Sequence, residues 1–178
     1  MIRVRAYRDS DDERVLALDE ASMTASGARP SRRRPSADLR TTLQSRLAVW
    51  VAVEGEDDAD VVGTVALRPP DDDTPLELVA DRKVAMLVNF RVSPDHQRQG
   101  IGRLLMETLL AWGAAHAYDC IIVNATPDRV AAMGVYASFG FFEAARSTRN
   151  QRELLWFEMP LASAERLPST EQHSRVSL

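Results

Sequence analysis

The chain is short of the residues that cross-link a protein or anchor it in a membrane. Cys120 is the only cysteine among 178 residues, so an intramolecular disulfide is excluded. No apolar run approaches the roughly 18 residues that a transmembrane helix needs. The first residues, Met1–Arg5, are too polar for a secretory signal. We therefore expect a soluble, cytoplasmic protein with no membrane partner.

The chain also lacks an excess of positive charge and any clustered metal ligands. Its formal net charge is −4 at pH 7 and its pI is about 5.4, which argues against general nucleic-acid binding. The histidines, His96, His116 and His173, are scattered without metal-ligand spacing. Cys120 lies in an apolar run and is interpreted as a small core residue rather than a nucleophile. We expect no nucleic-acid partner and no metal.

What the chain has is enough length and apolar content for one domain with a real core. Of its residues, 45% are hydrophobic and 27% are charged. Apolar periodicity and turn residues divide it into alternating strands and helices. Strands are predicted at 2–6, 47–54, 61–68, 84–92, 120–125, 142–147 and 153–159, and helices at 9–21, 36–46, 101–115 and 128–138.

The most informative segment is 97–103, which joins the predicted strand 84–92 to the helix that follows. Gly100 and Gly102 lack Cβ atoms, so several backbone amides can converge on one point at the helix start. Unpaired amides and the positive end of the helix dipole favour an anion there. The segment therefore predicts a phosphate-binding turn.

Two common phosphate loops do not fit this turn. A P-loop would need Gly-Lys-Ser/Thr, which is absent, and the dinucleotide pattern would need glycine where Leu105 stands. An unrelated α/β protein that binds ATP on the same glycine turn stays open as an alternative. Binding of ATP at this turn would need magnesium, and the sequence shows no motif for magnesium ligands.

The segment does match another signature, Gln/Arg-x-x-Gly-x-Gly/Ala, at every defined position from Gln97 to Gly102. Upstream, 92–94 is similar to the Val-x-Pro that, in proteins with this signature, commonly ends the strand before it. Downstream, 135–141 looks like Leu-Tyr-x-x-x-Gly-Phe, so two motifs occur in family order. The chain resembles the GNAT superfamily of acetyl-CoA-dependent N-acetyltransferases over roughly residues 1–160.

The resemblance implies the fold and the domain organisation. The expected class is α+β (α/β), with a mixed, mostly antiparallel sheet of about seven strands flanked by about four helices. The expected element order is β-α-α-β-β-β-α-β-α-β-β. One acetyltransferase domain would occupy residues 1–160, and 161–178 would form a flexible C-terminal tail.

The resemblance also implies a reaction and a set of site residues. Acetyl-CoA would be the co-substrate, and its acetyl group would pass to a primary amine by direct attack in a ternary complex. Tyr136 aligns with the tyrosine that protonates the coenzyme A thiolate in many members, and its reference pKa of about 10 keeps it protonated. The pantetheine arm and the pyrophosphate would be held by Phe90, Arg91, Val92, Arg98, Gln99, Gly100, Ile101, Gly102 and Arg103.

The chain departs from the family at three auxiliary positions. Met86 stands where histone acetyltransferases carry glutamate, and Asn124 where ribosomal-protein N-terminal acetyltransferases do. Arg129 falls where many members carry a cofactor-contacting asparagine. A water chain to Glu77, Asp81 or a main-chain carbonyl is one route for the ammonium proton, but no general base is assigned.

The acceptor is expected to be a small-molecule amine, with a peptide amine as the other possibility. The missing glutamates keep open a non-catalytic alternative, in which the domain binds acyl-CoA as a sensor or interaction partner. The basic segment Arg29–Arg34 is interpreted either as a contact for an acidic substrate group or as a solvated loop.

A homodimer through the last strands is possible by resemblance. The side chains that would contribute to its surface are apolar, and burial of at least half of them within the chain's own sheet is the other interpretation. These side chains are Leu154, Leu155, Trp156 and Phe157.

Overall fold

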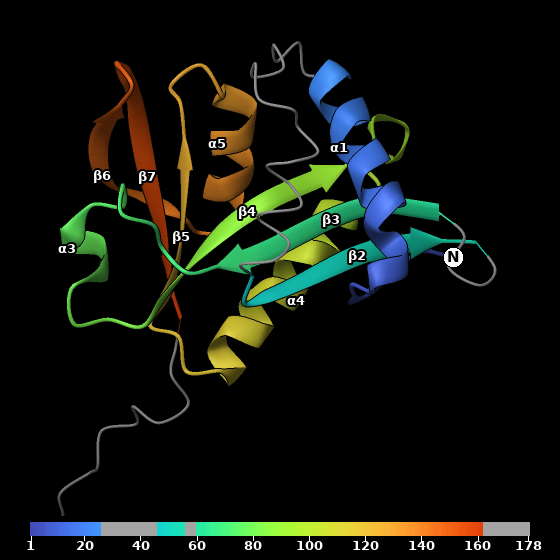
Figure 1. Cartoon of the computed structure of the whole chain (residues 1–178), viewed down its shortest axis with the longest axis horizontal. Helices are drawn as coiled ribbons and strands as arrows, with labels where there is room; N and C mark the ends of the chain where they lie inside the picture. The colour runs from blue at the N-terminus through green and yellow to red at the C-terminus, as the bar shows by residue number, and fades with distance from the viewer. Residues whose placement is uncertain (26–45, 56–59, 162–178) are drawn as a thin grey trace, which may run out of the picture.

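The computed structural model describes residues 1–25, 46–55 and 60–161, which form a mixed sheet of seven strands (Figure 1). The strand order is β1-β2-β3-β4-β5-β7-β6. β4 and β5 run parallel, and every other neighbouring pair is antiparallel. The predicted fold class is confirmed. The strands are β1 (Arg3–Ala6), β2 (Ala48–Glu54), β3 (Asp60–Arg68), β4 (Val84–Val92), β5 (Cys120–Ala125), β6 (Phe142–Arg149) and β7 (Arg152–Pro160).

The helices follow the predicted order, with one addition. A short helix, α3, lies in the connection between β3 and β4, where the sequence predicted none. The predicted helix 36–46 lies outside the described residues except for Arg46, which is not helical. The basic segment 29–34 and, apart from Leu161, the predicted tail also lie outside them. The described helices are α1 (Asp12–Ala25), α3 (Leu76–Val79), α4 (Ile101–Ala115) and α5 (Val130–Ser138), with 3-10 turns at Asp9–Asp11 and Pro94–His96.

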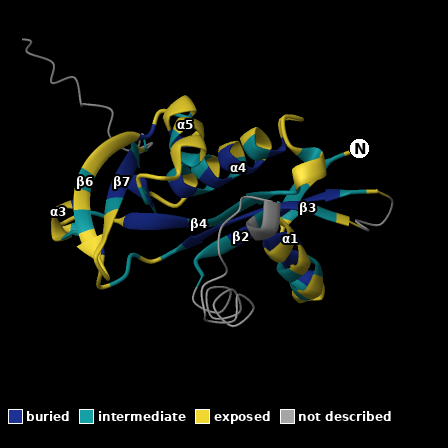
Figure 2. Cartoon of the chain, turned by 90° about the horizontal axis from the view of Figure 1, so that it is seen from above, coloured by how far each residue is buried: buried dark blue, intermediate teal, exposed yellow. Residues whose placement is uncertain are grey.

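The helices cover the two faces of the sheet separately (Figure 2). α4 and α5 lie on one face, and their buried side chains, including Leu105 and Tyr136, belong to the largest apolar cluster. α1 covers part of the other face through Val15, and α3 packs there through Leu78. Because both faces are covered, β2, β3 and β5 are almost continuous apolar runs rather than alternating ones.

α4 is the helix that positions the glycine turn, and its packing corrects one detail of the sequence analysis. Leu105 and Leu109 are fully buried, as the apolar spacing predicts. Leu104 belongs to the same sequence pattern, but it is 44% exposed. Met106 is fully buried in its place. The helix is thus rotated slightly from the predicted orientation, and its first turns lie against Gly63 of β3 and against Phe90 and Val92 of β4.

β7 is an interior strand of the sheet, between β5 and the edge strand β6. Leu155, Trp156 and Phe157 are buried there, and Leu154 is half-buried. The Trp156 indole N–H donates to Ser147 Oγ at 2.8 Å. This segment is therefore mostly core of the chain's own sheet, as the second interpretation predicted, rather than an exposed surface for a partner.

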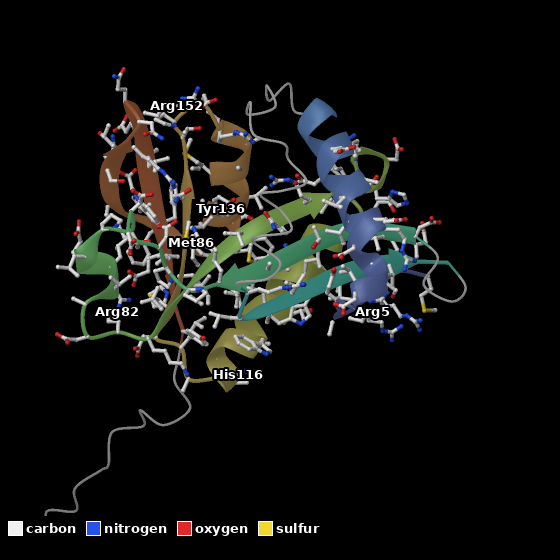
Figure 3. The ribbon with its side chains drawn as sticks, in the orientation of Figure 1. Arg5, Arg82, Met86, His116, Tyr136 and Arg152 are labelled. Carbon is white, nitrogen blue, oxygen red and sulfur yellow. The ribbon has the colours of Figure 1, made fainter. Side chains whose placement is uncertain are left out.

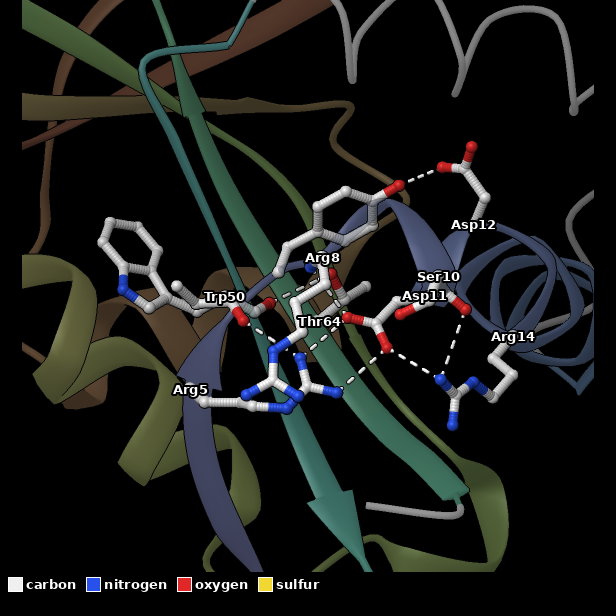
Figure 4. A network of polar contacts seen from close by, with 10 residues as sticks. Arg5, Arg8, Ser10, Asp11, Asp12, Arg14, Trp50 and Thr64 are labelled. Atoms are coloured by element: carbon white, nitrogen blue, oxygen red, sulfur yellow. Dashed lines mark hydrogen bonds and ion pairs between the residues drawn. The ribbon is translucent and has the colours of Figure 1, made fainter. Parts of the chain in front are cut away.

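A buried carboxylate joins the first strand to the first helix (Figure 4). Asp11 is fully buried, and its two oxygens accept from Arg5 at 2.7 and 3.0 Å, from Arg14 at 3.0 Å and from the Arg8 amide at 2.8 Å. The sequence analysis does not single out this residue. Hydrogen bonds from Arg5, followed by the smaller contributions of Arg8 and Arg14, lower the pKa of Asp11 despite its burial.

We expect Asp11→Asn to lower the free energy of unfolding by about 3 kcal/mol at pH 7, because two guanidinium groups lose their buried partner. The pKa of Asp11 is lower in the folded state, so its stabilisation exists above the unfolded pKa of about 3.9 and disappears as pH falls. The difference between variant and wild type should therefore shrink below pH 4 in urea unfolding. Asp72→Asn, an exposed control, should change stability by less than about 0.5 kcal/mol.

Candidate functional site

The parallel strands β4 and β5 pair only at their beginnings. The paired residues end at Met86 and Ile122. β4 continues to Val92 and β5 to Ala125 without further pairing between them. Beyond these residues the two strands diverge, as Figure 1 shows, and we call the unpaired stretch between their backbones the opening.

A β-bulge in β4 accompanies this divergence. The register with β3 shifts between Thr64 and Ala66, opposite Asn89 and Phe90. Asn89 has φ 53°, a left-handed conformation that asparagine tolerates better than most residues. Beyond the bulge, Arg91 pairs with Thr64 on the β3 side. The edge that faces β5 therefore keeps backbone groups that no described strand pairs.

The glycine turn lies directly beyond the end of β4, as the sequence predicted. Arg98 has φ 61° and Gly100, the N-cap of α4, has φ 83°. The amide of Leu104 donates to the Gly100 carbonyl at 3.1 Å. Within the described ranges, the amides of 98–103 have no backbone acceptor, and no side chain caps the helix. These donors are therefore available to an anion at the positive end of the helix.

Gly102 brings the turn close to β4. A Cβ atom on Gly102 would lie 3.2 Å from Phe90 Cζ and 3.8 Å from Val92 Cγ2. A larger side chain there would push the helix start away from the strand. Gly100 has open space around it, so glycine is favoured there by its positive φ and not by crowding.

Arg98 and Arg103 flank the turn, and both are exposed. The Arg103 guanidinium lies 5.9 Å from the centre of the Phe139 ring and 3.9 Å from a Glu107 oxygen. Because Phe139 immediately follows α5, Arg103 stands between the two helices on this face. Both arginines are therefore available to an anion on the turn.

Tyr136, the predicted proton donor, lies between α5 and the sheet (Figure 3). Its ring is buried against Phe141 and Phe157, with centroid distances of 5.9 and 6.2 Å. No hydrogen bond links its hydroxyl to the residues that the structure describes. Burial raises the pKa of Tyr136 above 10, although the charges of Arg91 and Arg129 oppose this shift. The phenol is therefore protonated at neutral pH.

None of the positions considered for a general base carries a free carboxylate beside the opening. Met86 is buried in an apolar cluster with Ile122 and Trp156, and Asn124 is half-buried. Glu77 and Asp81 are exposed and lie before β4 begins, at the end of the strand away from the glycine turn. The structure thus does not bring these two carboxylates to the place where the strands diverge.

The sequence analysis does not identify one buried carboxylate on the sheet, that of Glu158. Glu158 of β7 pairs with Ile122, in the row where β4 and β5 last meet. It accepts two hydrogen bonds from Arg82, at 3.0 and 2.5 Å. The signal in the sequence was a single glutamate between apolar neighbours of a strand. Its partner Arg82 lies 76 residues away, so no local sequence pattern indicates this pair.

The remaining candidates from the sequence lie away from this opening. Cys120 is fully buried, and burial raises the pKa of its thiol to about 11. Nowhere in the described ranges do three or more His, Cys, Asp or Glu side chains gather as metal ligands would. None of the helices in the same ranges combines the length and the apolar character that crossing a membrane requires.

Comparisons with known proteins agree with this geometry. A profile of the Acetyltransferase (GNAT) family matches residues 13–141. Human N-acetyltransferase 8B is 34% identical over 98 residues, which are 55% of this chain and 40% of that protein. The chain therefore spans less than half the length of this curated relative.

Solved structures show the same fold. The ribosomal-protein-S18-alanine N-acetyltransferase of Escherichia coli aligns with a TM-score of 0.69 at 18% identity, covering 94% of this chain and 99% of that one. The protein yncA of Salmonella typhimurium, solved with its cofactor acetyl-CoA, aligns with a TM-score of 0.67 at 16% identity. That alignment covers 92% of this chain and 96% of yncA.

Two glycine substitutions should change stability in opposite directions. Gly100→Ala places a Cβ in the left-handed region and should lower the free energy of unfolding by about 1–2 kcal/mol. Gly134→Ala, on the exposed face of α5 with nothing within 4 Å, should raise it by about 0.5–1 kcal/mol. Urea unfolding measures both, and changes of the same sign would contradict the left-handed turn.

Proposed function

This chain belongs to the Acetyltransferase (GNAT) family, and from that premise we propose that it transfers an acetyl group from acetyl-CoA to a primary amine. The observation that carries the proposal is the position of the amide turn, 98–103, at the end of a strand that diverges from its neighbour. The turn can hold a phosphate, and the unpaired stretch between β4 and β5 can hold the reacting groups. Transfer takes place by direct attack in a ternary complex.

The residues around the turn fit acetyl-CoA. Donors without partners in the described ranges suit its pyrophosphate, and Gly102 keeps the turn close to β4. The unpaired edge of β4 suits an extended arm with amide groups. Bound there, acetyl-CoA supplies an activated acetyl group. The residues proposed to hold it are Phe90, Arg91, Val92, Arg98, Gln99, Gly100, Ile101, Gly102 and Arg103.

Tyr136 is the proposed proton donor to the leaving thiolate. Its raised pKa keeps the phenol protonated at neutral pH, and its buried ring fixes the direction of the hydroxyl. Packing against Phe141 and Phe157 supplies this rigidity. No proton acceptor is assigned, because Met86 and Asn124 cannot remove a proton from an ammonium group.

We further propose that the acceptor is a small molecule. The neighbour from Escherichia coli is named for the alanine of a ribosomal protein. At the position of the glutamate in that class of enzyme, this chain has Asn124. The difference supports an acceptor of another kind, and the peptide amine is the alternative.

A second candidate is an acyl-CoA-binding domain without catalysis. The buried, apolar Met86 favours it, because no carboxylate occupies that position. It keeps the cofactor site and predicts no turnover with any amine. Release of coenzyme A in the presence of amines therefore separates the two functions.

We expect Tyr136→Phe to lower kcat about 100-fold in a coenzyme A release assay, because the ring stays but the proton is lost. The affinity for acetyl-CoA should change by less than about threefold, since the ring packing is kept. In the wild type, activity that depends on the protonated phenol should fall only above pH 10. The matched control is Tyr118→Phe, at a buried tyrosine before β5.

Equal kcat values for Tyr136→Phe and the wild type would contradict the assigned proton donor. Acetyl-CoA binding without release of coenzyme A from any amine would instead favour the non-catalytic candidate.

A further inference from the structure

The side chains at the end of β4 alternate between the two faces of the sheet. Phe90 and Val92 point toward α4, where both approach Gly102. Arg91 points to the other face, because its Nε donates to Asp19 of α1 at 3.0 Å. The guanidinium group therefore stands beside the opening, on the face opposite the glycine turn.

Two hydrogen bonds to described residues hold this guanidinium group, and part of the group has no partner among those residues. Besides the bond to Asp19, one Nη1 hydrogen is donated to the Phe90 carbonyl at 3.1 Å. The Arg91 side chain is 33% exposed, and its Nη2 group has no partner in the described ranges. Asp19 is buried, and it orients the Arg91 guanidinium group while the Nη2 hydrogens stay available to a ligand.

A second arginine lies on the β5 side of the opening. Arg129 follows β5 and is the N-cap of α5; it is exposed and forms no ion pair with any described residue. The charges of Arg91 and Arg129 both lower the pKa of Tyr136, against the effect of its burial. Both arginines therefore act on the phenol proposed to lie beside the reacting atoms.

The charges around this space do not cancel. Asp19 compensates Arg91, and the exposed Asp128 stands beside Arg129 and Arg152. Among the residues that the structure describes, these three guanidinium groups and two carboxylates leave an excess of one positive charge. The neighbouring side chains Met86, Val88, Asn124 and Trp156 carry no charge. Glu158, in the row where β4 and β5 last meet, is compensated by Arg82.

We propose that the acceptor carries a carboxylate close to its primary amine, as a free amino acid does, and that Arg91 binds this carboxylate. The inference rests on the proposed function, and it makes Arg91 a specificity-determining residue of the same site. A planar fork with free N–H donors is the group that binds carboxylates in the bidentate manner. A peptide N-terminus has an amide in place of that carboxylate, so this site favours a free amino acid over a peptide.

The same charges help the amine to react. An ammonium group close to guanidinium groups has a lower pKa, so more of it is the neutral nucleophile at neutral pH. Water can then accept the proton without a protein carboxylate beside it. The carboxylate of the acceptor offsets the repulsion that a simple amine would meet.

The test is a coenzyme A release assay with matched pairs of acceptors. Each α-, β- or γ-amino acid is compared with its own carboxamide, which keeps the amine and the side chain but removes the negative charge. We expect the best amino acid to exceed its carboxamide by about 10- to 100-fold in kcat/KM. In Arg91→Gln this ratio should fall to about one, whatever the absolute rate.

Two further variants keep the test decisive. Arg129→Gln should reduce the same ratio of kcat/KM values. The substitution removes no bond to a described side chain, so it tests the inference even if Arg91→Gln does not fold. Arg3→Gln, on the edge strand β1, removes an equal charge at the far end of the sheet and should leave the ratio unchanged.

The outcomes separate this inference from the proposed function. Equal rates for amino acids and carboxamides would keep the acetyltransferase and overturn the carboxylate contact. A preference that survives both Arg91→Gln and Arg129→Gln would overturn the assignment to these arginines. A chain that acetylates neither series would overturn the proposed function and, with it, this inference.

Discussion

The divergence of β4 from β5 is the constraint on which the rest of the site depends. β4 stays paired with β3 to its end, whereas its pairing with β5 stops after three residues. A parallel pair that stops after Met86 and Ile122 leaves an edge of backbone groups without partners. Such an edge is costly inside a sheet unless something pairs with it. The extended arm of the proposed co-substrate would satisfy it.

The divergence also explains how two faces of one sheet serve a single reaction. The glycine turn and Tyr136 lie on the face of α4 and α5, whereas Arg91 reaches the face of α1. An unbroken sheet would separate these groups. In the proposed reaction, the acetyl donor lies on one side of the opening and the acceptor enters from the other. Packing holds Tyr136 in place, and an ion pair holds Arg91.

The parts that could be predicted from the sequence are those with a local cause. The glycine turn follows from the backbone freedom of Gly100, and α4 follows from its apolar spacing. Leu104 and Met106 are two residues apart and flank the buried stripe of α4 on opposite sides, and only packing against the sheet decides which of them is buried. The divergence, the buried Asp11 and the pair of Glu158 with Arg82 depend on contacts between distant segments. A local sequence pattern contains no information about such contacts.

The central claim is that the turn at 98–103 binds the pyrophosphate of acetyl-CoA, and calorimetric titration tests it most directly. We predict micromolar binding that is lost in Gly102→Glu, whose carboxylate would repel the phosphates and crowd Phe90. Ala111→Glu, on the exposed face of the same helix, should bind as the wild type does. A folded wild-type chain that does not bind acetyl-CoA, or a Gly102→Glu variant that binds equally well, would contradict the account.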